Sequence, residues 1–125
     1  MSNTRKAILI VDDSSLITER LVELLKKEES VASVDVAKDY NDAIRLLTEK
    51  KTDIVFLDIH LPGKSGIELL KFITPTYPEI KVVMLSNESN EYYKRLCLTN
   101  GALYFIDKSK EFELITETIS LLDNN

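Results

Sequence analysis

The sequence has few of the residues that make disulfides, multi-histidine metal sites or long loops. Among its 125 residues are one cysteine, Cys97, one histidine, His60, three glycines and three prolines. A single cysteine excludes an intramolecular disulfide and any thiolate-rich zinc or iron–sulfur site, and a single histidine excludes a multi-histidine metal site. The scarcity of glycine and proline leaves little material for disordered linkers. We therefore expect a compact protein from a reducing compartment, and we place it in the cytoplasm.

A long apolar run and an excess of positive charge are also missing. Residues 1–6 precede a run of only five apolar residues, so the sequence predicts neither a signal peptide nor a membrane-spanning helix. Lysine and arginine number 16 against 21 aspartates and glutamates, which gives a net charge of −5. Such a surface repels a phosphate backbone. We expect no direct contact with nucleic acid or a membrane.

What is present is a regular alternation of short apolar runs with longer amphipathic stretches. The length suits one domain with a single core, so we expect one unit over residues 1–125. Runs rich in β-branched residues that alternate with helical patterns are typical of βαβ units around a parallel sheet. The predicted strands are residues 7–11, 31–37, 54–57, 80–85 and 102–106. The second is the most polar of the five, which suits an edge of the sheet.

Local signals mark several ends of the predicted helices. Ser14 and Ser15 offer capping hydroxyls for the first helix, and Asn41 can cap the second. The third helix is expected to close at Pro75 and Pro78. The last helix carries four apolar residues at helical spacing, namely Phe112, Ile115, Ile119 and Leu122.

Polar groups capable of chemistry follow four of the five strands. Asp12 and Asp13 follow the first strand, Asp58 the third and Ser86 the fourth, while Lys108 comes shortly after the fifth. Ligands of open parallel sheets bind beyond the carboxyl ends of the strands. Three carboxylates there suit a hard cation such as Mg²⁺. With the metal offsetting their repulsion, one carboxylate can act as a nucleophile, while the lysine and the serine hold phosphoryl oxygens.

Each of these residues also has an ordinary structural interpretation. An aspartate after a strand is commonly a turn or cap residue, a lone lysine is commonly solvated, and Ser86 can cap the helix that follows it. Asp58 is harder to explain in this way, because a carboxylate directly after four buried apolar residues is costly without a partner. Taken together at one edge of the sheet, the five groups favour a functional site.

The motifs as a set resemble the receiver domains of two-component response regulators. The resemblance is carried by the acidic pair 12–13, the segment from Asp58 to Gly66, Ser86, and the segment from Gly101 to Lys108, in that order along nearly the whole chain. It implies a stand-alone, chemotaxis-receiver-like domain with a flavodoxin-like (βα)5 fold. It also implies a doubly wound, five-stranded parallel sheet in the order 2-1-3-4-5.

The resemblance also implies a metal site. Asp13 would bind Mg²⁺ directly and Asp12 mainly through water. Asp58 and the backbone carbonyl of His60 would complete the protein ligands. Mg²⁺ is the only cofactor that this reading requires.

For the phosphoryl group, the resemblance makes Asp58 the acceptor from a histidine kinase or a phosphotransfer protein. Lys108 would pair with the phosphoryl group, and Ser86 would hydrogen-bond to it and draw its loop inward. Phe105 stands at the aromatic switch position of the family, although it can equally be an ordinary buried strand aromatic. The chain would then be a phosphoacceptor signalling protein rather than an enzyme with a separate substrate.

Several positions depart from the family pattern or modulate it. Asn87 follows Ser86 where receivers usually carry a small residue, which narrows access to the acyl phosphate. Ser109 follows Lys108 where a proline is usual, so a cis peptide bond is not expected at that junction. His60 and Glu88 stand two residues after Asp58 and Ser86, at positions that flank the path of attacking water.

The output of such a domain would be protein binding. The face formed by the fourth helix, the fifth strand and the fifth helix is where receivers usually engage partners or form homodimers. Two alternatives stay open. One is a metal-dependent phosphohydrolase, which typically has its nucleophile after the first strand and a second aspartate two residues later, where this chain has Ser14. The other is a receiver-like adaptor that is never phosphorylated.

Overall fold

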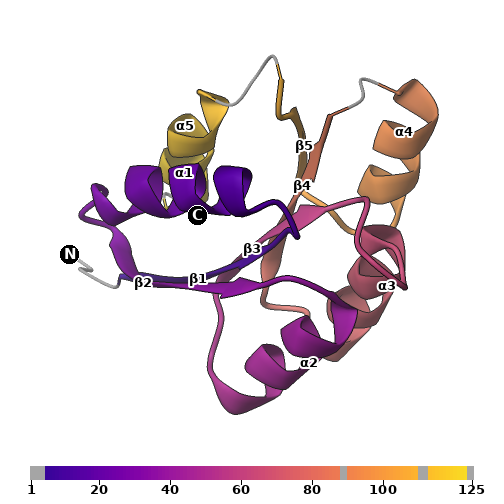
Figure 1. The fold of residues 1–125 in the computed structure, drawn as a ribbon, viewed down its shortest axis with the longest axis horizontal. Coiled ribbons are helices and arrows are strands. Elements are labelled where there is room, and N and C mark those ends of the chain that lie inside the picture. Colours follow the sequence, from indigo (N-terminus) through magenta and orange to yellow (C-terminus); the bar gives the residue numbers. More distant parts are fainter. Residues whose placement is uncertain (1–4, 88–89, 110–112, 124–125) are drawn as a thin grey trace.

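The computed structural model describes residues 5–87, 90–109 and 113–123. Its five strands are all parallel and lie in the order β2-β1-β3-β4-β5, which confirms the predicted fold class (Figure 1). The strands are β1 (Lys6–Val11), β2 (Val31–Ala37), β3 (Ile54–Asp58), β4 (Lys81–Ser86) and β5 (Tyr104–Asp107). The helices are α1 (Ser15–Lys26), α2 (Tyr40–Glu49), α3 (Gly66–Thr76), α4 (Glu91–Thr99) and α5 (Leu114–Asp123).

The strand order follows from the polarity of the strands. β3 is buried at every position, and β1 is buried from Ile8 to Val11. These two strands pair with each other in register from Ile8 opposite Ile54 to Val11 opposite Leu57. β2 is partly exposed along its middle and lies at the edge, as its polar sequence predicts. The carboxyl ends of β1 and β3 are therefore neighbours at the centre of the sheet.

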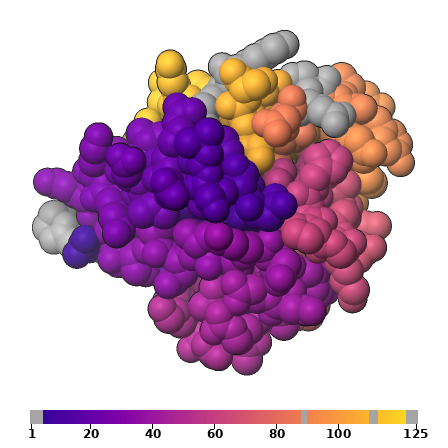
Figure 2. Space-filling model, viewed as in Figure 1, coloured from indigo at the N-terminus to yellow at the C-terminus, as the bar shows by residue number. Residues whose placement is uncertain are grey.

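Helices cover both faces of the sheet. α1 and α5 pack on one face, where their apolar residues meet β-strand residues such as Ile10 and Phe56. α2, α3 and α4 cover the other face over Val11 and Leu57. Figure 1 shows the two layers, and in Figure 2 the yellow atoms of α5 border the indigo atoms of α1. Successive strand residues therefore alternate between two separate cores.

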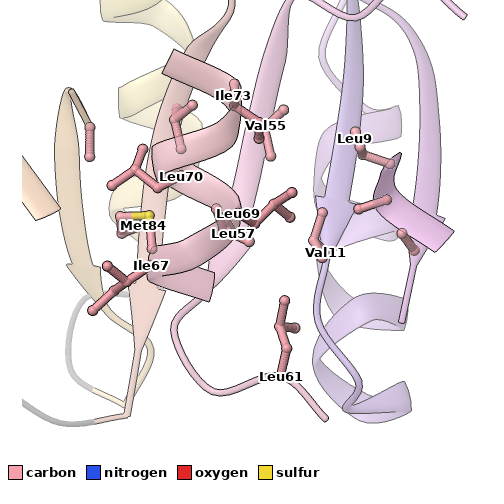
Figure 3. Packing of buried hydrophobic residues seen from close by; sticks show 14 of the residues in the cluster. Leu9, Val11, Val55, Leu57, Leu61, Ile67, Leu69, Leu70, Ile73 and Met84 are labelled. Atoms are coloured by element: carbon pink, nitrogen blue, oxygen red, sulfur yellow. The ribbon is translucent and has the colours of Figure 1, made fainter. Parts of the chain in front are cut away.

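α3 contributes heavily to the core beneath α2–α4. Its buried side chains project towards β3 and β4 (Figure 3), and they include Ile67, Leu69, Leu70 and Ile73. Four buried side chains of this size remove enough apolar surface from water to contribute about 1.5–3 kcal/mol each relative to exposure. This packing fixes the start of α3 against the end of β3, next to Asp58.

The caps of the first two helices differ in how well the sequence predicted them. Ser14 is the N-cap of α1, as expected, and its hydroxyl accepts a hydrogen bond from Ile17 N. The prediction that Asn41 caps α2 is wrong. The cap is Asp39, whose Oδ1 accepts from Asp42 N at 2.8 Å. Because α2 begins at Tyr40, Asn41 already lies inside its first turn.

Several boundaries shift by one or two residues. β1 begins at Lys6 rather than at Ala7, and β4 spans Lys81–Ser86 rather than residues 80–85. α3 continues one residue past Pro75 and ends at Thr76, whereas the sequence placed its end at the prolines. β5 begins at Tyr104 rather than at Ala102.

Ile115 and Ile119 of α5 are fully buried as predicted. Phe112, Glu88 and the side chain of Leu122 lie outside the described residues. Within the described ranges, no helix is long and apolar enough to cross a bilayer.

Candidate functional site

Three aspartates meet at the carboxyl edge of the two central strands. Asp12 follows β1 directly, and Asp58 is the last residue of the neighbouring strand β3. Carboxylate oxygens of Asp12, Asp13 and Asp58 all lie within 4.8 Å of one another. Asp12 is 0% and Asp58 is 5% exposed, whereas Asp13 is open to solvent. The three acidic residues that the sequence singled out thus form one cluster.

Lys108, the residue that follows the edge strand β5, completes the cluster. Its ammonium lies 2.9 Å from Asp12 Oδ2 and 3.5 Å from Asp58 Oδ1, and the residue is only 6% exposed. Its backbone N–H donates to Ser86 O at 2.7 Å, which continues the β4–β5 ladder. The lysine is therefore held at both ends, and its charge is shared between two carboxylates.

The cluster carries more negative than positive charge. Three carboxylates and one ammonium sum to 3 × (−1) + 1 = −2. Buried like charges this close repel one another, and a divalent cation is the counter-charge that oxygen donors select. The donor set therefore fits Mg²⁺, and the exposed Asp13 keeps one side of the cluster accessible to solvent.

Burial raises the pKa of the Asp58 carboxyl above its ordinary value. The loss of hydration is the largest cause, and repulsion from Asp12 acts in the same direction. Attraction to Lys108 and the hydrogen bond from His60 N oppose the shift. The site thus stores an unfavourable charge on Asp58, which metal binding or esterification of that carboxylate would relieve.

Local backbone bonds fix the direction of the two buried carboxylates. Asp12 Oδ1 accepts from Ser14 N at 2.9 Å, and Asp58 Oδ1 accepts from His60 N at 3.3 Å. In both cases an aspartate at the carboxyl end of a strand accepts the N–H of the residue two positions ahead, which is an Asx turn. Each turn leaves the other carboxylate oxygen free of that backbone bond.

Gly66 lets α3 start directly against the end of β3. Its N–H donates to Ile59 O at 2.7 Å. A Cβ added at Gly66 would overlap the carbonyl oxygen of Asp58. Only glycine permits this approach, so Gly66 fixes the backbone on which Asp58 sits.

The residues after β4 lie beside the cluster. Asp58 pairs with Leu85 across β3 and β4, so Ser86 extends one residue beyond it. Ser86 is buried, and the next residue, Asn87, is exposed. The predicted neighbour Glu88 lies in the part of the chain that is not described. Ser86 is thus brought to the site edge as expected.

Two further predicted residues connect the site to α4 and its core. Phe105 is half-buried and packs against the core under α2–α4. His60 is exposed, and its ring meets Tyr93 of α4 edge-on with a centroid separation of 6.5 Å. The peptide bond between Lys108 and Ser109 is trans, as predicted from the absence of proline.

The sequence did not predict the roles of two residues that shape the site. These are Asp107 and Gly66. Asp107 is buried next to Lys108 and ends β5. The signal that identified Asp12 and Asp58, an aspartate at the end of an apolar strand, was also present here. Gly66 gave no comparable signal, because its role depends on a contact between two elements.

A sequence model for the response regulator receiver domain family matches residues 8–120. The transcriptional regulatory protein LnrK of Bacillus subtilis is 30% identical over 90% of this chain and 51% of its own length. The transcriptional regulatory protein DegU of Brevibacillus brevis is 27% identical over 92% of this chain and 49% of its length. The chain thus spans about half the length of these curated relatives.

A solved structure with the same fold is the response regulator domain of Thermotoga maritima CheB. It superposes with a TM-score of 0.83 at 28% identity and covers 96% of this chain and 95% of its own. The sheet order, the acidic cluster and the family match agree in defining a phosphoacceptor class of signalling proteins. The chain belongs to the response regulator receiver domain family.

Members of this family are phosphoacceptors of two-component systems that interact with histidine kinases or phosphotransfer proteins. They generally bind Mg²⁺ at an acidic pocket. In this chain Asp12, Asp13 and Asp58 form an acidic cluster.

Proposed function

We propose that Asp58 accepts a phosphoryl group from a phosphohistidine donor in a Mg²⁺-dependent reaction, and that this switches a protein-binding face. Asp13, Asp12, Asp58 and the His60 carbonyl would hold the metal. Lys108 and Ser86 would hold the transferred phosphoryl group. The observation that carries the proposal is the convergence of three carboxylates within 4.8 Å around a lysine that contacts two of them.

The chemistry follows from this convergence. A carboxylate oxygen of Asp58 attacks phosphorus, a P–O bond forms, the P–N bond of the donor breaks, and the donor imidazole takes up a proton. Mg²⁺ supplies charge neutralisation when it is bound. Lys108 then meets a phosphoryl group of charge about −1.5 to −2. It can exchange part of its bond with Asp12 for a stronger one to the phosphoryl oxygens.

The donor would be a histidine kinase or a phosphotransfer protein, and the downstream target would be another protein or a second copy of this chain. The face of α4, β5 and α5 is the proposed output surface, and exposed Tyr92, at 69%, lies on α4. We further propose that residues 1–125 act as one receiver domain. The intact mass of the protein isolated from its natural cells tests that point, because the curated relatives are about twice as long.

Intact-mass measurement after incubation with a phosphohistidine donor tests the acceptor. Wild type with Mg²⁺ should gain one phosphoryl group, and the gain should disappear with EDTA. Asp58→Asn should show no gain, because an amide is a poor nucleophile. Asp13→Asn should slow labelling and raise the Mg²⁺ concentration that it requires.

Asp35→Asn is the matched control, because Asp35 is a strand carboxylate that pairs with Lys50 on the surface, away from the cluster. It should be labelled like wild type. Labelling that persists in Asp58→Asn would move the acceptor elsewhere. No labelling of wild type by any donor, with Mg²⁺ bound, would favour the phosphorylation-silent adaptor, and turnover of a chromogenic phosphate ester would favour the phosphohydrolase.

A further inference from the structure

The turn that follows β5 contains a buried carboxylate which the proposed phosphoryl chemistry does not use. Asp107 is 4% exposed and pairs with Ser86 across β4 and β5. Its Oδ1 accepts two hydrogen bonds from Ser109, one from the backbone N–H at 2.9 Å and one from the hydroxyl at 2.6 Å. Lys108 is the residue enclosed between these two partners.

The same turn recurs at the ends of three strands. Asp12, Asp58 and Asp107 each accept the N–H of the residue two positions ahead, namely Ser14, His60 and Ser109. The first two turns orient the carboxylates of the acidic cluster. The third differs, because both donors of Ser109 meet one oxygen of Asp107 and the residue it encloses is the cluster's lysine.

The alternation of side chains along β5 explains how the turn acts on the lysine. Phe105 packs on the core under α2–α4, and Ile106 belongs to the core under α1 and α5. Asp107 therefore lies on the side of Phe105, while Lys108 leaves on the opposite side, towards Asp12. The ammonium of Lys108 pairs with Asp12 and Asp58, whereas Asp107 holds the backbone from which the lysine starts.

The backbone of Lys108 is fixed on both sides as a result. Its N–H is bonded to Ser86 O at 2.7 Å, and the turn from Asp107 to Ser109 fixes the chain that follows. A lysine side chain carries its ammonium group on a flexible stem of four carbons. Placing its ammonium 2.9 Å from Asp12 and 3.5 Å from Asp58 requires that its Cα be held firmly.

We infer that Asp107 and Ser109 are positioning residues that aim Lys108 at the acidic cluster. The expected effect of these residues on phosphorylation rests on the proposed function, whereas their expected effect on the position of Lys108 does not. An asparagine at position 107 keeps an oxygen acceptor and removes the charge, so it separates positioning from electrostatics. At position 109, alanine keeps the N–H and loses the hydroxyl, so it tests the hydroxyl alone.

The first experiment observes the lysine directly. Wild type and variants are labelled with ¹³C at the lysine ε carbons, and their NMR spectra are compared without Mg²⁺. The Lys108 signal is the one that disappears in Lys108→Arg. Asp107→Ala should shift the Lys108 signal or broaden it. Asp107→Asn should leave it near its wild-type position. An unchanged signal in folded Asp107→Ala would overturn the inference, whether or not Asp58 is ever phosphorylated.

The second experiment measures the rate of Asp58 phosphorylation by phosphoramidate at saturating Mg²⁺. Loss of the turn in Asp107→Ala should slow labelling about tenfold, the effect of removing one or two hydrogen bonds that position the lysine. Asp107→Asn and Ser109→Ala should stay within about threefold of wild type, because each keeps the bond from Ser109 N to residue 107. Mg²⁺ affinity should be unchanged in all three, because none alters a carboxylate of the cluster.

A double-mutant cycle separates positioning from a general loss of structure. In a Lys108→Ala background, Asp107→Ala should cause no further slowing, because the residue through which it acts is gone. Additive slowing would overturn the inference. If Asp107→Ala fails to fold, Asp107→Val decides the same point, because valine suits a strand end and also lacks an acceptor for Ser109. If wild type is not labelled but the Lys108 signal moves in Asp107→Ala, the proposed function is contradicted and this inference is supported.

Discussion

Gly66 and Asp58 are in direct backbone contact, because a Cβ on Gly66 would overlap the carbonyl oxygen of Asp58. The contact joins the first residue of α3 to the last residue of β3. The proposed acceptor therefore sits on a strand end that is braced by a helix start.

Gly66→Ala should destabilise the protein by about 3 kcal/mol, because backbone atoms that cannot rotate aside must move apart. Urea denaturation followed by circular dichroism measures the loss. Gly63→Ala is the matched control. Gly63 has a φ of +80° with no atom within 4 Å of an added Cβ, so its cost should be limited to about 1–2 kcal/mol of backbone strain. Equal losses for the two variants would show that the contact with Asp58 is not tight.

Asp58→Asn should raise the free energy of unfolding at pH 7 in EDTA, because it removes a buried charge whose pKa is raised mainly by burial. The folded wild type keeps the Asp58 proton to higher pH than the unfolded chain does, so its stability falls as pH rises through that interval. The advantage of the variant should therefore vanish below about pH 3.9, the ordinary aspartate value, and grow above it. Urea titrations at several pH values measure it.

With added Mg²⁺, wild type should become more stable than Asp58→Asn. A ligand at one hundred times its dissociation constant stabilises the folded state by about 2.7 kcal/mol, and the variant has lost one of the three clustered carboxylates. Asp35→Asn should show neither effect. A variant less stable than wild type at pH 7 in EDTA would mean that attraction to Lys108 outweighs the burial of Asp58.

Beryllofluoride with Mg²⁺, a mimic of the phosphoryl group, should shift NMR signals of Ser86, Asn87 and Phe105. The added negative group would draw Lys108 and Ser86 towards Asp58 and disturb the β4 and β5 ends. Val31, at the opposite end of the sheet, serves as the internal reference. In Ser86→Ala the shift of Phe105 should shrink. Changes confined to the neighbourhood of Asp58 would count against a switch.

His60→Ala should leave Mg²⁺ affinity nearly unchanged, because the proposed metal contact at this position is a backbone carbonyl. The lifetime of the acyl phosphate should change severalfold, because the exposed ring flanks the proposed path of attacking water. Calorimetry and the decay of the phosphorylated mass measure the two quantities. Tyr93→Leu removes the ring that His60 meets edge-on and tests whether that contact orients the imidazole. A drop in Mg²⁺ affinity of about tenfold, or 1.4 kcal/mol, would mean that the side chain holds the site together.

The alternation of apolar runs and amphipathic stretches by itself determined the fold class and the position of the candidate site. Asp12, Asp13, Asp58, Ser86 and Lys108 could be named because the carboxyl ends of parallel strands share one edge. The sequence predicted the ends of the helices less accurately. Asp39 and Asn41 are both good capping residues, and the choice between them depends on where α2 starts.

Only the tertiary structure decided how the charges pair. Lys108 and Asp12 are 96 positions apart, and their 2.9 Å contact results from the order and register of four strands. The overlap at Gly66 and the turn at Asp107 likewise depend on how one element lies against another. Residue types and spacing along a chain specify which groups reach a common edge. Distances of a few ångströms within that edge are set by packing, because each side chain starts from a backbone that other elements hold in place.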